Sequence, residues 1–211
     1  MEKQKLEGGH NLILTVPSGL LNLVPPSSDL DAEMALLRTH PEAIRYLPFM
    51  PRKVDVEDMK KRREYRAKND TIMDFNILLT ADDGQSSKLI GISGLFNIDK
   101  VNETCSTGIL IHPDYFRAGH ATQVLYTVMK YAFEDDTMHM HRVTFETGEN
   151  NVRMRGWLEN VLGIEREFTW REAWKAEDGS RIDVVGYSAL AQDWGDIKRQ
   201  MEARIGKACI S

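Results

Sequence analysis

A short turn near the middle of the chain combines residue types and spacing that bind anionic groups. It follows an apolar run at 108–112 that is typical of a strand. The turn itself, 114–122, contains Arg117, Gly119 and His120. The apolar residues that follow have the spacing of one helix face: Val124, Leu125, Val128, Met129, Ala132 and Phe133. A helix that starts at a strand end presents free backbone N–H groups, so this segment predicts an anion site, with a diphosphate as the natural ligand.

Length and composition are those of an ordinary globular protein. The chain has 211 residues, of which 42% are hydrophobic and 28% charged, and this is long enough for a full core. The sequence contains no apolar run of about 18 residues and no recognisable secretory signal, so we expect a cytoplasmic protein that does not interact with membranes. Cys105 and Cys209 are far apart and predict neither a disulfide framework nor a metal site. A net charge of −5 argues against a nucleic-acid partner.

The elements that must position the turn alternate between strands and helices. Hydrophobic periodicity predicts strands at 12–16, 20–24, 74–79, 89–96, 107–111, 141–147, 168–174 and 183–190. It predicts helices at about 30–44, 55–68, 120–134, 151–161 and 191–208. Residues 1–10 are expected to be flexible, and 82–87 to form a polar hairpin loop. Since no change in composition separates the strands, we expect a single α+β domain over 1–211.

This order of elements, from about Leu20 to Tyr187, resembles the GCN5-related N-acetyltransferase (GNAT) superfamily, in particular its RimJ/RimL-like branch. The turn at 112–122 carries the sharpest likeness, because Phe116, Gly119 and Ala121 occupy the aromatic, glycine, and glycine-or-alanine positions of the family signature. Two further segments are similar to the branch: the Asn-containing turn at 149–151 with its following helix, and 44–48.

The resemblance implies a mixed αβα fold, whose central, mostly antiparallel twisted sheet has one splayed strand pair and helices on both faces. It also implies acetyl-CoA as co-substrate. The pantetheine arm would extend the sheet along 108–112, and the N–H of Leu110 or Ile111 would polarise the thioester carbonyl. The residues expected to bind CoA are Leu110, Ile111, His112, Phe116, Arg117, Ala118, Gly119, His120, Ala121, Thr122 and Asn151.

The implied reaction is N-acetylation of a primary amine, either a peptide N-terminus or a small amine, by a monomer or homodimer. A protonated amine must lose a proton before it attacks. Ser106 stands where many relatives have a glutamate, Met154 stands where the branch often has serine, and the following helix is one residue longer. We therefore assign Glu146, at a strand end, as the general base, with Asp99, Glu103 and His112 as weaker alternatives.

The replacement of the usual glutamate leaves a second interpretation open, a non-catalytic acyl-CoA-binding module of the same fold. The acceptor is expected to meet the loop at 48–52 and a strand face that carries Trp170 and Trp174. The overall acidity favours a cationic acceptor. His139 and His141 would share a strand face, but two ligands without a third do not make a metal site.

Overall fold

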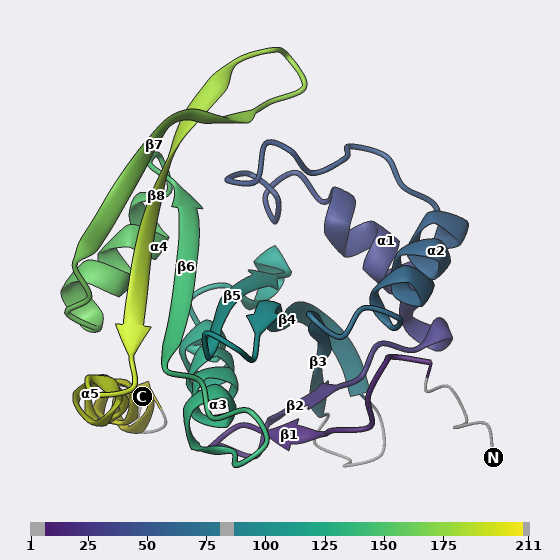
Figure 1. Cartoon of the computed structure of the whole chain (residues 1–211). Helices are drawn as coiled ribbons and strands as arrows, with labels where there is room; N and C mark the ends of the chain where they lie inside the picture. The colour runs from purple at the N-terminus through teal and green to yellow at the C-terminus, as the bar shows by residue number, and fades with distance from the viewer. Residues whose placement is uncertain (1–6, 81–86, 209–211) are drawn as a thin grey trace.

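The computed structural model describes residues 7–80 and 87–208, and its strands form one sheet. The strands are β1 (Leu14–Thr15), β2 (Leu21–Val24), β3 (Met73–Thr80), β4 (Ser87–Asp99), β5 (Thr104–Ile111), β6 (Arg142–Gly148), β7 (Arg166–Lys175) and β8 (Arg181–Leu190). They lie in the order β1-β2-β3-β4-β5-β6-β8-β7, and every neighbouring pair is antiparallel except β5 and β6 (Figure 1). The expected mixed fold with a mostly antiparallel sheet is confirmed.

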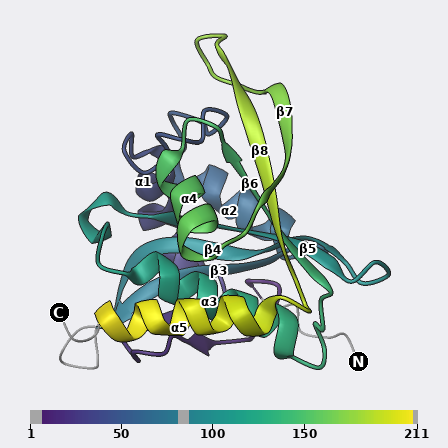
Figure 2. The ribbon, with the colours of Figure 1, turned by 90° about the vertical axis from the view of Figure 1, so that its left-hand side faces the viewer.

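Helices cover both faces of this sheet. The helices α1 (Asp31–Thr39) and α2 (Val56–Arg66) lie on one face. On the other face lie α3 (His120–Glu134), α4 (Val152–Gly156) and α5 (Trp194–Ala208), with α5 packed along α3 (Figure 2). Short helical segments complete the chain: η1 (Ser28–Leu30), η2 (Pro113–Tyr115) and the π-helical η3 (Trp157–Val161).

Alternation along each strand divides the core between the two faces. Ile109 and Ile111 of β5 and Phe145 of β6 pack in the larger cluster on the α3 face. Leu110 packs in a smaller cluster with Met34 of α1 and other residues of the α1–α2 side. The side chains of successive β5 residues therefore pack on opposite faces of the sheet, in two different hydrophobic clusters. A ligand between β5 and β6 would lie between these two clusters.

Several boundaries differ from the predictions. α1 ends at Thr39 and does not reach 44, because Pro41 lacks an N–H and disfavours helix in the residue before it. The predicted helix at 151–161 is α4 followed by the π-helical η3, and the last helix starts at Trp194. β6 starts at Arg142, and His139 before it has φ 41°, so the expected shared strand face of His139 and His141 is wrong.

At the N-terminal side, residues 7–10 pack against the protein, since His10 Nε2 lies 2.8 Å from the Asp74 carbonyl oxygen. The other part of the predicted flexible segment, 1–6, lies outside the described residues, as do 82–86 of the predicted hairpin loop and Cys209. Within the described ranges, none of the helices combines the length and apolar character needed to cross a bilayer.

Candidate functional site

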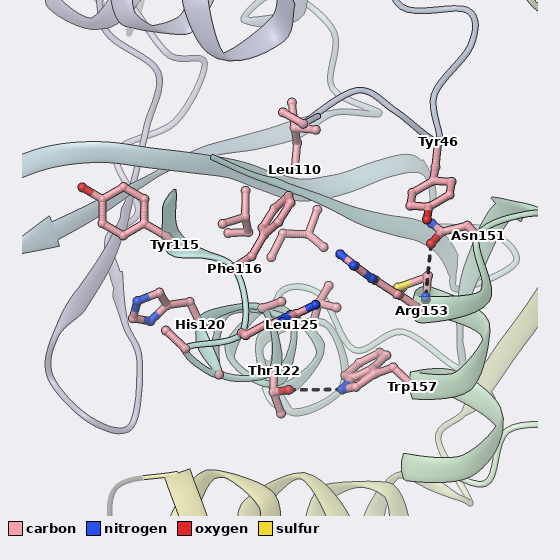
Figure 3. Close-up of a pocket in the computed structure, with 18 of the residues that line it drawn as sticks. Tyr46, Leu110, Tyr115, Phe116, His120, Thr122, Leu125, Asn151, Arg153 and Trp157 are labelled. Carbon is pink, nitrogen blue, oxygen red and sulfur yellow. Dashed lines mark hydrogen bonds between the residues drawn. The ribbon is translucent and has the colours of Figure 1, made fainter. Parts of the chain in front are cut away.

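The sheet opens between β5 and β6. The two strands pair only at Thr104–Arg142, Cys105–Val143 and Ser106–Thr144, and beyond Ser106 they diverge. A cavity of about 730 Å³ lies at this split, a size typical of small-molecule sites. It is bounded by the end of β5, the turn before α3, α4 and the chain after α1 (Figure 3).

β5 directs alternate backbone groups into this split. The His112 N–H donates to the Ile90 carbonyl of β4 at 2.7 Å, and the Thr144 hydroxyl of β6 donates to the Cys105 carbonyl at 3.3 Å. Because successive residues of a strand point their backbone groups to opposite edges, the N–H groups of Ile109 and Ile111 face the split. The Leu110 N–H faces β4, so Ile111 is the predicted oxyanion donor that the geometry favours. Ile109 is a second inward-facing donor that the sequence analysis missed.

The turn before α3 exposes a run of backbone donors. Among the described residues, none accepts a hydrogen bond from the six consecutive N–H groups of 117–122. Arg117 has φ 65° and Gly119 has φ 77°, which curl the backbone so that N–H groups converge. The first turn of a helix also carries the positive end of its dipole. This segment is therefore built to hold an anion at the edge of the cavity.

Cationic side chains approach the cavity from three elements. Arg117 comes from the turn, Arg153 from α4 and Arg204 from α5. Among the described residues, none of the three forms an ion pair. Figure 3 shows the Arg153 side chain extending across the cavity toward Phe116. These arginines give the site the positive charge that a ligand with several phosphates requires.

His120 does not add to this charge. Burial lowers the pKa of its imidazole below the ordinary histidine value, and its Nδ1 is buried with no hydrogen-bond partner in the described part of the chain. The ring is therefore neutral at pH 7. The arginines therefore supply the positive charge of the site.

The Asn151 side chain holds the start of α4 at the cavity edge. Its Oδ1 accepts the Met154 N–H at 3.3 Å (Figure 3), and its Nδ2 donates to the Thr147 hydroxyl at 3.0 Å. Trp157 Nε1 donates to the Thr122 hydroxyl at 3.1 Å and ties the η3 segment to α3. The extra helical residue noted in the sequence coincides with η3, and π-helical segments of this kind often occur at functional sites.

Two predicted residues, His112 and Glu146, lie off the cavity wall. His112 Nδ1 accepts the Asp114 N–H at 3.4 Å and caps η2. Glu146 points to the α1–α2 face of the sheet, opposite to Phe145, whose ring lies 6.5 Å from that of Trp157. Glu146 is exposed, yet protein atoms around its carboxyl group displace part of the water, and this desolvation raises its pKa.

The other ten predicted CoA-binding residues all line the cavity: Leu110, Ile111, Phe116, Arg117, Ala118, Gly119, His120, Ala121, Thr122 and Asn151. The sequence analysis missed Ile109, Tyr46, Arg153, Trp157 and Arg204 as lining residues. Arg153 and Trp157 sit in the helix after the Asn turn, so their position there was a usable signal. Arg204 is about 50 residues further on, and no local pattern links it to the site.

On the α1–α2 face, the loop expected to form the acceptor wall reaches β7. Phe49 packs edge-on against Trp174, with ring centroids 4.9 Å apart, and Trp170 stacks on Phe168 at 4.4 Å. At the start of the split, Ser106 Oγ accepts a hydrogen bond from Asn97 Nδ2 at 3.3 Å and lies 3.0 Å from Thr144 Oγ1. Ser106 thus joins a polar cluster and supplies no carboxylate.

A split parallel strand pair beside a curled, positively charged helix start defines a class of α+β proteins that hold a long, thin, phosphate-bearing ligand. The acetyltransferase (GNAT) domain family matches residues 21–161, and the chain belongs to this family of acetyltransferases. The resemblance seen in the sequence is thereby confirmed for the superfamily. A search of curated proteins found no match.

Solved structures share the fold. A GCN5-related N-acetyltransferase from Brucella melitensis has a TM-score of 0.73 at 18% identity, covering 92% of this chain and 85% of its own. Spermidine N-acetyltransferase from Vibrio cholerae, solved with CoA and spermine, has a TM-score of 0.72 at 16% identity, and the match covers 83% of this chain and 98% of its own. The microcin C7 self-immunity acetyltransferase MccE, solved with acetyl-CoA and AMP, has a TM-score of 0.68 at 16% identity, and the match covers 81% of this chain and 92% of its own.

Proposed function

We propose that this protein transfers the acetyl group of acetyl-CoA to a primary amine in a ternary complex. The observation that carries the proposal is the run of six N–H groups at 117–122 that have no hydrogen-bond acceptor in the described part of the chain, placed beside the edge of β5 that faces the split. A diphosphate joined to a peptide-like arm matches these two features in one molecule. Two of the structural neighbours were solved with acetyl-CoA or CoA, which supports the same ligand here.

Each part of acetyl-CoA has a set of partners in this proposal. The N–H groups of 117–122 bind the diphosphate, and Arg117, Arg153 and Arg204 add charged contacts. The pantetheine amides pair with the inward-facing backbone of Ile109 and Ile111, as an added strand would. One of these N–H groups donates to the thioester oxygen and stabilises the oxyanion that forms there.

The acceptor amine enters from the α1–α2 face and attacks the thioester carbon. Glu146 takes a proton from the amine directly or through one water, and its raised pKa keeps it a usable base. The new C–N bond forms, the tetrahedral oxyanion collapses, and the C–S bond breaks. The CoA thiolate leaves and takes up a proton.

The acceptor is a peptide α-amine, by the RimJ/RimL-like resemblance, or a small amine. The domain functions as a monomer or a homodimer in the cytosol, where the buried and unpaired Cys105 stays reduced.

A non-catalytic acyl-CoA-binding module is the second candidate. Two observations favour it: Ser106 replaces the usual glutamate, and Glu146 is not on the cavity wall. Such a module would bind acetyl-CoA through the same donors without turning it over.

Titration calorimetry with acetyl-CoA, paired with a thiol-release assay over a panel of amines, separates the two functions. The proposal expects binding in the wild type, loss of binding in Gly119→Trp, and CoA release that depends on an amine. Binding without release on any amine assigns the protein as a module. An absence of acetyl-CoA binding contradicts both.

A further inference from the structure

An unbalanced group of charges lies between α1, α2 and the sheet. Arg62 and Arg66 of α2 both contact Asp74 of β3: Arg62 Nη1 lies 3.5 Å from Asp74 Oδ2, and Arg66 Nη2 lies 2.8 Å from Asp74 Oδ1. Arg38 lies on α1, which packs against α2; burial lowers the pKa of its guanidinium, and the charge of Arg66 lowers it further. Among residues 7–80 and 87–208, Asp74 is the one carboxylate that pairs with Arg62 and Arg66, and Arg38 forms no ion pair. Two positive charges are left uncompensated.

These arginines are partly withdrawn from water. The side-chain exposures are 27% for Arg62 and 21% for Arg66. Arg38 Nε is buried with no partner in the described part of the chain, and Arg38 Nη2 contacts the Met50 sulfur at 3.4 Å. Burial, together with the repulsion of Arg38, lowers the pKa of Arg62 to about 9. Burial and mutual repulsion thus make these positive charges energetically unfavourable in the free protein, and a bound anion would reduce this unfavourable free energy.

Arg63, the next residue along α2, shows the contrasting arrangement. Its Nε and Nη2 donate to Asp31 at 3.1 and 2.9 Å, and its Nη1 lies 2.9 Å from Glu7. A buried arginine in the same helix is therefore fully paired. The deficit of carboxylates is confined to the group around Asp74, where Arg62 and Arg66 lie on the face that meets the sheet.

The sheet register connects this group to the split. Asp74 pairs with Gly94, and Gly94 pairs with Gly108 of β5. Because Ser106 pairs with Thr144, Glu146 is the residue that faces Gly108 across the opening. At the usual strand spacing, the Asp74 Cα is about 10 Å from the Gly108 Cα. One row across the sheet thus holds the arginine group at one end and the proposed base at the other.

The Phe96 ring lies over the middle of this row, where both residues are glycines. A Cβ on Gly94 would lie 3.0 Å from Phe96 Cε1, and one on Gly108 would lie 3.9 Å from Phe96 Cε2, so the Phe96 ring lies beside both glycines. The Arg66 guanidinium carbon is 5.2 Å from the centre of that ring. An acceptor chain that reaches from the split to the arginines therefore passes over the Phe96 ring.

We propose that Arg38, Arg62 and Arg66 form a subsite for an anionic group of the acceptor, a carboxylate or a phosphate, carried about 10 Å from the amine that is acetylated. The inference rests on the proposed transfer reaction and narrows its substrate class. It reverses the expectation drawn from the overall charge of −5, because the local charge on the acceptor face is positive. A polyamine such as spermidine would be repelled from this subsite.

Triglycine and its C-terminal amide are matched probes for the subsite. An extended tripeptide spans about 10 Å, and the pair differs only in the terminal charge. We expect kcat/KM to be about tenfold or more higher for triglycine than for the amide, the value of one hydrogen bond to a charged group. In Arg62→Gln and Arg38→Gln this preference should fall toward one, with the acetyl-CoA Kd unchanged. An aminoalkyl phosphate of similar length shows which anion the wild type prefers.

Lys61→Gln is the matched control, since it removes the same charge from an exposed position on α2 and should keep the preference. Arg62→Gln relieves repulsion, so its melting temperature should not fall. Equal rates for triglycine and its amide in the wild type would overturn the subsite, as would a preference that survives in both arginine variants. CoA release that depends on other amines would still uphold the transfer reaction. An absence of release on any amine refutes the transfer reaction and the subsite together.

Discussion

Replacing Gly119 by alanine tests the anion-binding turn with the smallest possible change. Gly119 is the residue before α3 and has φ 77°, a left-handed conformation that glycine adopts freely. A Cβ there costs about 1–2 kcal/mol. The variant therefore either keeps the turn and becomes less stable, or relaxes φ and changes the direction of the N–H groups at 120–122.

Both results can be measured. If the turn is kept, the melting temperature should fall by about 2–4 °C for each kcal/mol of strain. If it relaxes, the loss of one N–H to the diphosphate costs about 1.5–3 kcal/mol, and the acetyl-CoA Kd should rise about tenfold or more. Calorimetric titration and thermal unfolding of the same sample separate the two results.

Gly195→Ala is the control for this experiment. Gly195 lies in α5, and a Cβ there would approach only Arg199 Nη1, at 3.8 Å. Alanine favours a helix, so this variant should be as stable as the wild type or slightly more stable, with unchanged acetyl-CoA affinity. If Gly119→Ala showed the same melting temperature and the same Kd as this control, the argument from the left-handed turn would be refuted.

Three further predictions concern titrating groups. Glu146→Gln should lower kcat about a hundredfold or more, with little change in the acetyl-CoA Kd. In the wild type the rate should rise with pH through a pKa above the ordinary glutamate value, and the variant should lack this rise. An unchanged pH–rate profile in the variant would show that Glu146 is not the base. Desolvation opposes ionisation of Glu134, but hydrogen bonds from Lys130, Lys198 and Trp194 outweigh it and lower its pKa to about 2. Because this pKa is below the unfolded value, the carboxylate stabilises the fold above about pH 4.5, and the contribution is lost as the pH falls toward 2; acid unfolding of Glu134→Gln should lack this part of the pH dependence. Burial raises the pKa of the Cys105 thiol to about 12. In a Cys209→Ser variant, a thiol reagent should therefore not label Cys105 until the protein is unfolded. Rapid labelling of the native variant would contradict this prediction.

The sequence was informative where local pattern decides structure. The stripe from Val124 to Phe133 predicted α3 with the observed bounds, because helical periodicity is a property of neighbouring residues. The strands at 168–174 and 183–190 and the glycine turn before α3 were likewise predicted from neighbouring residues. These local features, together with the family resemblance that they carry, indicated the fold and ten of the residues that line the cavity.

The sequence by itself therefore determined the fold class, the glycine turn before α3 and the absence of the usual glutamate at Ser106. Tertiary structure decided how distant elements meet. The inward direction of the Ile109 and Ile111 amides follows from how β5 pairs with β4 and β6, and the approach of Arg204 follows from the packing of α5. The positive group around Asp74 depends on α1 and α2 packing on one face of the sheet, so the overall negative charge of the chain gave no sign of it.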